Sequence, residues 1–393
     1  MGKSQSVVII GGGAVGSSTA YHLARDPSFR GSITVIERDP TYRIASSSLS
    51  ASSIRQQFST PVCIRMSQYG RAFLGAGAEL LAVDGDQPAL GYRERGYLFL
   101  ASDAGVDVLR ENHAVQTAEG ADIALLSPAE IAACWPWMST DGIALGAWGN
   151  SGEGWFDGPA LLAALRRKAR ALGVTYVAQD AAGLVLRGGR VAAVRLGDGS
   201  EVPCDMAVNA AGAWSARVAG FAGIDLPIRA RKRMIYVFRC AQPIEGSGLV
   251  IDPEGIFFRP EGAGFICGRS PGEGEPDPDE PPLEVEEEMF LERVWPVLAH
   301  RVPAFAELRR TGEWAGYYEY NTFDQNGVIG AHPAVPNLIH AAGFSGHGIQ
   351  HSPATGRGVA ELVAHGGFVS LDLSPLGFGR IIENRPLVEK NIV

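Results

Sequence analysis

The stretch SVVIIGGGAVG, residues 6–16, decides how this chain begins to fold. Residues 6–10 are almost wholly apolar, which is typical of a strand buried on both faces of a parallel sheet. The glycines that follow predict a tight turn, and residues 17–25 place apolar side chains at helical spacing. A second apolar run, residues 32–37, predicts the next strand. Together these segments predict a β-α-β unit.

Composition limits the class of protein. The chain has 393 residues, 46% of them hydrophobic, which predicts two or three domains rather than one. Its net charge of −9 does not favour nucleic acid or an anionic membrane as a partner. No apolar run reaches the length of about 18 residues that a spanning helix needs. Five scattered cysteines without a CxxC pair indicate no metal site and a reducing, cytoplasmic location.

The glycines at positions 11, 13 and 16 have the spacing of the dinucleotide-binding fingerprint. Gly11 permits the tight turn, Gly13 lets a pyrophosphate approach the backbone, and Gly16 lets helix and sheet pack closely. Glu37, at the end of the second strand, can accept a hydrogen bond from a ribose hydroxyl. The pattern predicts a dinucleotide with an adenosine half and leaves FAD and NAD both open.

A second glycine-rich turn lies near the C-terminus. Residues 338–342 read as a strand, and Gly343-Phe344-Ser345-Gly346-His347-Gly348 precedes a helix expected over residues 352–364. Backbone N–H groups at such a helix start can face a developing negative charge.

These two turns, with residues 208–215 and 316–330, resemble the D-amino-acid-oxidase-like flavoprotein superfamily. Within it, the sequence is similar to the branch of sarcosine and glycine oxidases and the proline dehydrogenase β-subunit. The resemblance implies FAD rather than NAD and an α/β, two-domain flavoprotein. Its Rossmann-like FAD-binding domain would comprise residues 1–85, 151–225 and 326–393. A substrate domain with a mixed sheet would be formed by two insertions, residues 86–150 and 226–325.

The resemblance also implies which residues surround FAD. They are Gly11, Gly13, Ala14, Val15, Gly16, Glu37, Arg38, Ser46, Ser47, Ala182, Ala211, Gly212, Trp214, Gly343, Gly346, His347, Gly348 and Ile349.

Four residues are implied at the substrate. Arg55 matches an arginine that grips the substrate carboxylate in sarcosine oxidases, a geometry that suits a guanidinium. The alternative for Arg55 is a structural ion pair. Tyr318 is expected to line the pocket, Gln350 stands where relatives have a second carboxylate-binding lysine, and His347 is a candidate for tuning substrate protonation or for a structural flavin contact.

Departures from the family pattern refine the expectation. Tyr317 stands where some relatives attach the flavin through a cysteine, and no histidine lies between His22 and His113, where others use one. The resemblance therefore implies non-covalent FAD. Ile266 replaces the lysine that activates oxygen in sarcosine oxidases, so the electron acceptor is either oxygen, at a reduced rate, or an electron-transfer partner.

The expected reaction is oxidation of the C–N bond of a small amine or amino acid, with a secondary or N-substituted amino acid favoured. A hydride would pass to flavin N5, and the imine would hydrolyse in water. One alternative is a 2-hydroxy-acid dehydrogenase with His347 as the base. Another is a flavoprotein that serves as an assembly or scaffold factor. The sequence leaves the substrate and the oligomeric state open.

Overall fold

The computed structural model describes residues 5–272 and 274–391 of the chain. It begins with the expected β-α-β unit: β1 (Gln5–Ile10), α1 (Ala14–Arg25) and β2 (Gly31–Glu37). Strand β1 pairs in parallel with β2 on one side and with β13 (Met206–Asn209) on the other. Residues 7–10 are buried, because this strand lies in the interior of its sheet.

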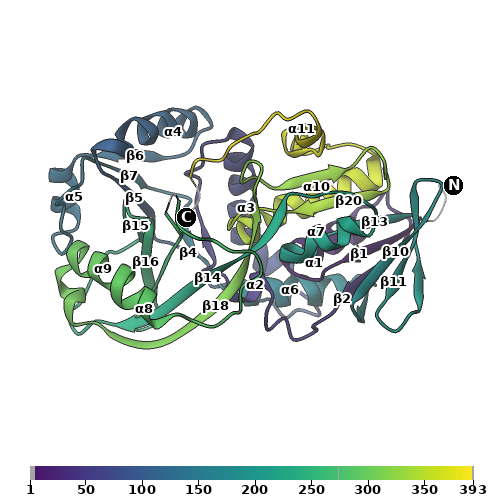
Figure 1. The fold of residues 1–393 in the computed structure, drawn as a ribbon, viewed down its shortest axis with the longest axis horizontal. Coiled ribbons are helices and arrows are strands. Elements are labelled where there is room, and N and C mark those ends of the chain that lie inside the picture. Colours follow the sequence, from purple (N-terminus) through teal and green to yellow (C-terminus); the bar gives the residue numbers. More distant parts are fainter. Residues whose placement is uncertain (1–4, 273, 392–393) are drawn as a thin grey trace.

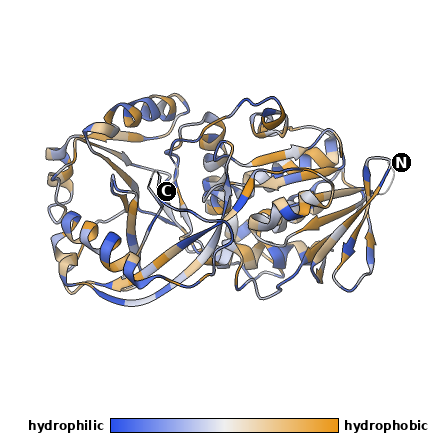
Figure 2. Cartoon of the chain, in the orientation of Figure 1, coloured by the Kyte–Doolittle hydropathy of each residue, from blue (hydrophilic) through white to orange (hydrophobic). Residues whose placement is uncertain are grey.

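A six-stranded sheet surrounds this unit, in the order β19-β20-β13-β1-β2-β9. Its edge strands are β9 (Thr175–Ala178) and β19 (Val328–Ala331), and β20 (Leu338–Ala342) lies between β19 and β13. All neighbouring strands are parallel except β19 and β20. Figure 2 shows hydrophobic residues gathered along these strands.

Four long helices accompany the six-stranded sheet. Helix α1 packs against α10 (Gly348–His365) and α6 (Gly158–Ala171), and α10 packs against α3 (Pro61–Leu80). A small antiparallel sheet follows β9, formed by β10 (Ala181–Arg187), β11 (Arg190–Leu196) and β12 (Glu201–Pro203).

An eight-stranded mixed sheet forms the other half of the molecule (Figure 1). Its order is β18-β14-β17-β16-β15-β5-β7-β6. In chain order the strands are β5 (Tyr97–Ala101), β6 (Ile123–Leu126), β7 (Leu145–Gly149), β14 (Ile228–Arg239), β15 (Leu249–Ile251), β16 (Ile256–Glu261), β17 (Gly264–Arg269) and β18 (Arg309–Asn321). Phenylalanines 238, 258, 265 and 305 pack in its core: Phe238 stacks on Phe265, and Phe305 meets the other three rings edge-on.

Short helices cover this second sheet: α4 (Val106–Ala118), α5 (Pro128–Cys134), α8 (Glu287–Met289) and α9 (Trp295–Arg301). The two mixed sheets and their helices confirm the expected α/β fold. The six-stranded sheet takes strands from residues 5–37, 175–209 and 328–342, and the eight-stranded sheet takes them from residues 97–149 and 228–321. The exact domain boundaries stay a prediction.

The long strands β14 and β18 run from the second half to the middle of the molecule (Figure 1). They pair over their whole length, with Ala230 opposite Glu319 and Ile228 opposite Asn321. This pairing brings the end of β18 to α2 (Ser46–Leu49) and to the turn after β13.

The C-terminal residues 386–391 cross back to the segment before α3. Glu389 is 1% exposed and accepts hydrogen bonds from the backbone and hydroxyl groups of Ser59 and Thr60. Thr60 is the N-cap of α3, so the carboxylate of Glu389 caps that helix from a distant part of the chain.

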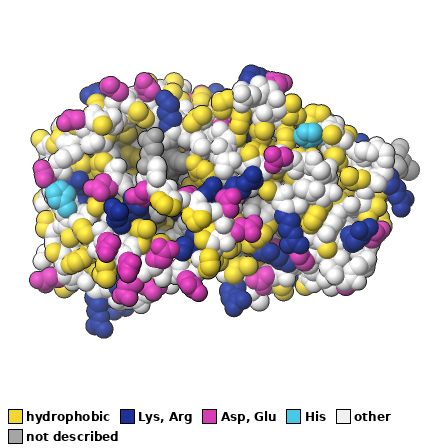
Figure 3. All heavy atoms as spheres, viewed as in Figure 1, with side chains coloured by type: hydrophobic (Ala, Val, Ile, Leu, Met, Phe, Trp, Pro, Cys, Tyr) yellow, Lys and Arg dark blue, Asp and Glu magenta, His cyan; other side chains and the backbone are white. Residues whose placement is uncertain are grey.

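Ion pairs hold the described residues 274–282 of the acidic, proline-rich segment. Glu275 pairs with Arg269, Asp277 forms two hydrogen bonds with Arg233, and Asp279 pairs with Arg231. On the face of the molecule drawn in Figure 3, acidic and basic side chains are interspersed.

Candidate cofactor and substrate site

A cavity extends from the turn after β1 to the ends of β14 and β18. One end is lined by residues of the β1-α1 turn and the end of β2. The other end is lined by residues of α2, β14, β18 and the glycine-rich turn before α10. The cavity therefore lies where the two halves of the molecule meet.

The first glycine-rich turn lies at one end of this cavity. Gly11 has a φ of +97°, and a Cβ at this position would lie 2.3 Å from the backbone oxygen of Ala210. A Cβ on Gly16 would lie 1.9 Å from the backbone oxygen of Gly11. Helix α1 starts without a side-chain cap on Gly13 and without an acidic residue in its first turn, so its N-terminal end is suited to an anionic group.

Glu37 stands beside this turn. Its carboxylate accepts hydrogen bonds from the backbone N–H of Gly12 (2.8 Å) and of Asp39 (2.9 Å). Next to it, the guanidinium of Arg38 lies 3.6 Å from the ring centroid of Trp214. Both Glu37 and Arg38 line the cavity, so an acidic group and a stacked cation mark the end of β2.

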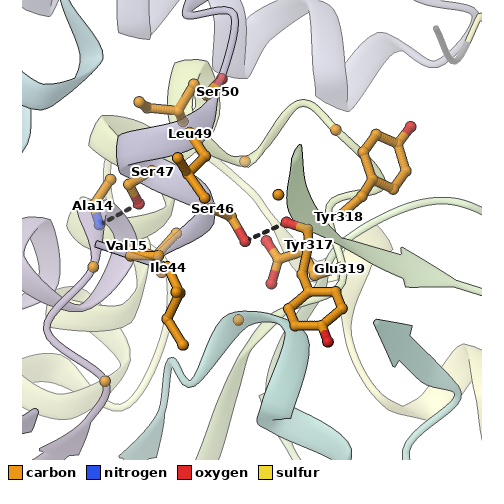
Figure 4. Close-up of a pocket in the computed structure, with 18 of the residues that line it drawn as sticks. Ala14, Val15, Ile44, Ser46, Ser47, Leu49, Ser50, Tyr317, Tyr318 and Glu319 are labelled. Carbon is orange, nitrogen blue, oxygen red and sulfur yellow. Dashed lines mark hydrogen bonds between the residues drawn. The ribbon is translucent and has the colours of Figure 1, made fainter. Parts of the chain in front are cut away.

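Two serines of α2 connect the ends of the cavity (Figure 4). Ser47 Oγ accepts a hydrogen bond from the backbone N–H of Ala14 (3.0 Å), and Ser46 Oγ donates one to the backbone oxygen of Tyr317 (2.7 Å). The short helix α2 thus links the start of α1 to strand β18.

The second glycine-rich turn closes the far end. Gly343 and Gly346 have φ angles of +85° and +90°, and Ser345 also has a positive φ. The hydroxyl of Tyr318 donates a hydrogen bond to the backbone oxygen of Ser345 (2.5 Å). A Cβ on Gly346 would lie 2.3 Å from the Tyr318 ring, so the turn and β18 pack in direct contact.

Arg55 lines the cavity near this end and is 4% exposed. Its guanidinium donates to the backbone oxygens of Gln57 (2.8 Å) and Asn391, and it lies 4.2 Å from the ring centroid of Phe58. Within the described part of the chain, no carboxylate lies within 4.0 Å of it.

Comparison with known proteins identifies the family. The model for FAD-dependent oxidoreductases named DAO matches residues 6–362. This chain belongs to the DAO family of FAD-dependent oxidoreductases. Its cofactor is therefore FAD, which accounts for an extended cavity with two glycine-rich turns.

Relatives and solved structures agree with this assignment. The chain is 44% identical to FAD-dependent oxidoreductase domain-containing protein 1 of Xenopus laevis, over 98% of this chain and 84% of that protein. It is 27% identical to glycine oxidase of Geobacillus kaustophilus, over 96% and 97% of the two chains. The crystal structure of L-proline dehydrogenase from P. horikoshii superposes with a TM-score of 0.85 at 26% identity, covering 98% of this chain and 100% of that one.

Most of the residues expected around FAD line the cavity. They are Gly11, Gly13, Ala14, Val15, Glu37, Arg38, Ser46, Ser47, Ala211, Gly212, Trp214, Gly346, Gly348 and Ile349. Gly16 and Gly343 do not line it: Gly16 allows close approach to the backbone of Gly11, and Gly343 leaves room for the side chain of Ile228. Ala182 is exposed, and its neighbour Ala181 lines the cavity instead, because side chains alternate along β10.

Two of the residues expected at the substrate, Tyr318 and Gln350, also reach the cavity. Burial raises the pKa of the Tyr318 hydroxyl to about 12, so this group stays neutral. The side-chain oxygen of Gln350 accepts from the backbone N–H of Arg55 (2.9 Å), which fixes the segment that carries the arginine. Ile266 is buried inside the eight-stranded sheet and does not line the cavity.

The structure does not place His347 where a base is needed. The turn directs its ring away from the cavity, against Phe58 and His351, with ring centroids 5.2 and 4.9 Å away. Burial holds its pKa well below the usual value, and neither ring nitrogen has a hydrogen-bond partner in the described chain. A structural contact behind the turn fits this position better than acid–base catalysis.

His347 also belongs to a cluster that the sequence did not indicate. The ligand atoms of Cys63, His347 and His351 all lie within 4.8 Å of one another. Cys63 Sγ already donates to Asn326 Oδ1 and His351 Nε2 meets Ser67 Oγ, both at 3.0 Å. We treat the group as a packed polar cluster, since two of its three members have protein partners.

Glu319 is the residue that sequence reasoning missed. It points from β18 into the cavity, on the same side as Tyr317 and opposite to Tyr318 (Figure 4). The only sequence signal is a single carboxylate in the aromatic run Tyr317 to Tyr320 of a strand that is partly buried.

Among the described helices, none combines the length and the apolar character needed to cross a membrane.

Proposed function

We propose that this protein oxidises the C–N bond of a small amino acid, with a secondary or N-substituted amino acid favoured, and that Arg55 binds the substrate carboxylate. The observation that supports the proposal most is the burial of Arg55 beside the cavity without an ion-pair partner in the described chain. The guanidinium of Arg55 is buried, faces the cavity and forms no ion pair within 4.0 Å among the residues that the structure describes, so it is free to pair with an anionic substrate group.

The surroundings of Arg55 suit a carboxylate anchor. Its contacts with the oxygens of Gln57 and Asn391 and with the Phe58 ring hold the guanidinium in one orientation without neutralising it. A preorganised, partly desolvated guanidinium binds a carboxylate more strongly than a mobile surface arginine does.

The rest of the pocket suits a neutral amine. Bound FAD supplies a hydride acceptor. Leu49, Tyr97, Leu249 and Phe257 line the cavity together with Arg55, and these largely apolar walls exclude water from the amine. An apolar wall disfavours the ammonium form, so we expect the rate to rise with pH as the free amine becomes available.

The names of two relatives support the substrate class. Glycine oxidase and L-proline dehydrogenase are both named for small amino acids, whose shared feature is a carboxylate next to the amine carbon. A 2-hydroxy acid is less suitable, because its oxidation needs a base for the hydroxyl proton and His347 faces away from the cavity.

The test is an anaerobic titration of the flavin-loaded protein, followed by visible absorption. The panel contains prolines, N-methyl amino acids, primary amino acids, amines without a carboxylate and 2-hydroxy acids. We expect a carboxylated amine to bleach the flavin. Reduction by hydroxy acids alone would replace the proposal with the first alternative, and no reduction together with a co-purifying partner protein would favour an assembly role.

Two further properties follow as proposals. The flavin is non-covalent, because Tyr317 carries a phenol that donates to the oxygen of Pro281 where some relatives carry a cysteine. Acid precipitation should therefore release all yellow colour into the supernatant. Reoxidation by air should be slow compared with reoxidation by an artificial electron acceptor, because no lysine is among the described residues that line the cavity.

A further inference from the structure

A carboxyl group of β18 lines the cavity beside the glycine-rich turn before α10. A Cβ on Gly348 would lie 2.9 Å from one carboxylate oxygen of Glu319, and a Cβ on Gly212 would lie 3.7 Å from the other. Glu319 is thus wedged between the start of α10 and the turn after β13. Both of those segments line the cavity.

The other carboxylates that line the cavity are at the opposite end. Glu37 and Asp39 follow β2, and Asp180 lies between β9 and β10, beside the turn where the adenosine half of a dinucleotide binds. By the family resemblance, the glycine-rich turn before α10 would hold the isoalloxazine end of FAD, and Glu319 lies against that turn. Among the described carboxylates that line the cavity, Glu319 is the one that lies against this turn.

The charges around Glu319 do not neutralise it. Ala230 lies opposite it in β14, α2 presents serines, the turn after β13 presents Trp214, and His347 points its ring away. No described cation lies within 4.0 Å, and its named partners are the backbone N–H groups of Gly343 and Phe344. Burial raises the pKa of this carboxyl group to about 7.

We propose that Glu319 is a positioning residue for the flavin that sets its reduction potential. Reduction adds negative charge to the flavin, and an ionised carboxylate beside it opposes that charge, whereas a protonated one does not. The same carboxyl group also accepts from the N–H groups of Gly343 and Phe344, so it occupies donors of the turn that would otherwise face the added charge.

The consequence is a link between reduction and proton uptake. Above its pKa, Glu319 takes up a proton as the flavin is reduced, because the added charge makes the carboxylate more basic. The reduction potential should then fall more steeply with rising pH across the neutral range than at either side of it. This inference rests on bound FAD and does not depend on which substrate the enzyme uses.

The experiment compares flavin reduction potentials between pH 5.5 and pH 9, measured by equilibration with a reference dye and a chemical reductant. In Glu319→Gln we expect a higher potential than in the wild type at pH 8.5 and the same potential at pH 5.5. Glu313→Gln is the matched control, since it removes a carboxylate from the exposed part of the same strand, and it should follow the wild type.

Identical curves for Glu319→Gln and the wild type would overturn the inference. If Glu319→Gln does not retain FAD, the wild-type curve decides alone: a slope that is steeper within the neutral range than on either side supports the inference, and a uniform or lessening slope contradicts it. Glu319→Asp should keep the bend at a shifted pH, because it retains a titrating carboxyl group on a shorter side chain.

Discussion

At the scale of single residues, the clearest constraint is the lack of space at the first glycine-rich turn. Gly16 faces the backbone oxygen of Gly11 at a distance that no Cβ tolerates, so the turn and α1 must move apart if a side chain is added. The spacing of these glycines was visible in the sequence, and their contacts explain it.

Gly16→Ala should therefore lose most of its bound FAD. The Cβ would lie 1.9 Å from a backbone atom, so the start of α1 must shift away from the phosphates. The ratio of flavin to protein absorbance after gel filtration measures the loss. Gly75→Ala is the control, because nothing lies within 4 Å of its Cβ position, and it should keep full flavin content. Equal flavin content in both variants would contradict this reading of the turn.

Other residues could not be placed from sequence. Ala181 and Ala182 are neighbours in β10, so their side chains point to opposite faces of the strand. A shift of the strand by one residue would exchange which of them reaches the cavity, and the sequence does not fix that shift. His347 lies in a motif that faces the cavity, but the positive φ angles of the neighbouring residues turn its ring to the other side. Glu319 was missed because only the pairing of β14 with β18 brings it to the site.

At the scale of elements, local patterns predicted the β-α-β unit well, because strand, turn and helix are encoded in adjacent residues. Contacts between distant segments could not be predicted. The C-terminal strap, residues 386–391, is the main example: Glu389 caps α3, and the oxygen of Asn391 accepts from Arg55. Nothing in the sequence around these residues indicates either partner.

Glu389→Ala should lower the free energy of unfolding by about 3 kcal/mol, because it leaves the donors of half-buried Ser59 and buried Thr60 without a charged acceptor. Urea denaturation followed by tryptophan fluorescence measures the change. Glu383→Ala, also in the C-terminal region but exposed, should change the free energy by less than about 0.5 kcal/mol. A small effect of Glu389→Ala would show that the strap is not held by this carboxylate.

At the scale of the whole molecule, the chain crosses repeatedly between the two sheets, and this crossing buries ionisable groups. Burial lowers the pKa of His22 and His351 to about 3 and of His340 to about 4, and it holds that of His347 well below its usual value. In the opposite direction, burial raises the pKa of Glu153 to about 7.

These shifts predict that stability falls as the pH drops from about 6.5 to 4. Below about pH 6.5 these histidines are protonated in the unfolded chain but stay neutral in the folded one. Each histidine therefore lowers the free energy of unfolding by about 1.4 kcal/mol for every pH unit of acidification. Glu153 and Glu319 act oppositely between about pH 4.5 and 7, since their folded forms hold protons that the unfolded forms release. Four histidines outweigh two carboxyl groups.

Melting temperatures at several pH values test this balance. His22→Phe should lose less stability on acidification than the wild type, because it removes one titrating group from an aromatic pocket. The exposed His300, changed to Gln, should keep the wild-type dependence. A His22→Phe variant that is as acid-sensitive as the wild type would contradict the assignment of acid unfolding to buried histidines.

The most direct test of the central claim compares an amino acid that reduces the flavin with its own carboxamide, in the wild type and in Arg55→Ala. The concentration that half-reduces the flavin anaerobically is measured for all four combinations, with the exposed Arg65→Ala as control. We expect the wild type and the control to prefer the acid by about 30-fold or more, the value of one buried charged contact. In Arg55→Ala the preference should disappear while the protein stays yellow. An undiminished preference for the acid in Arg55→Ala would contradict the account.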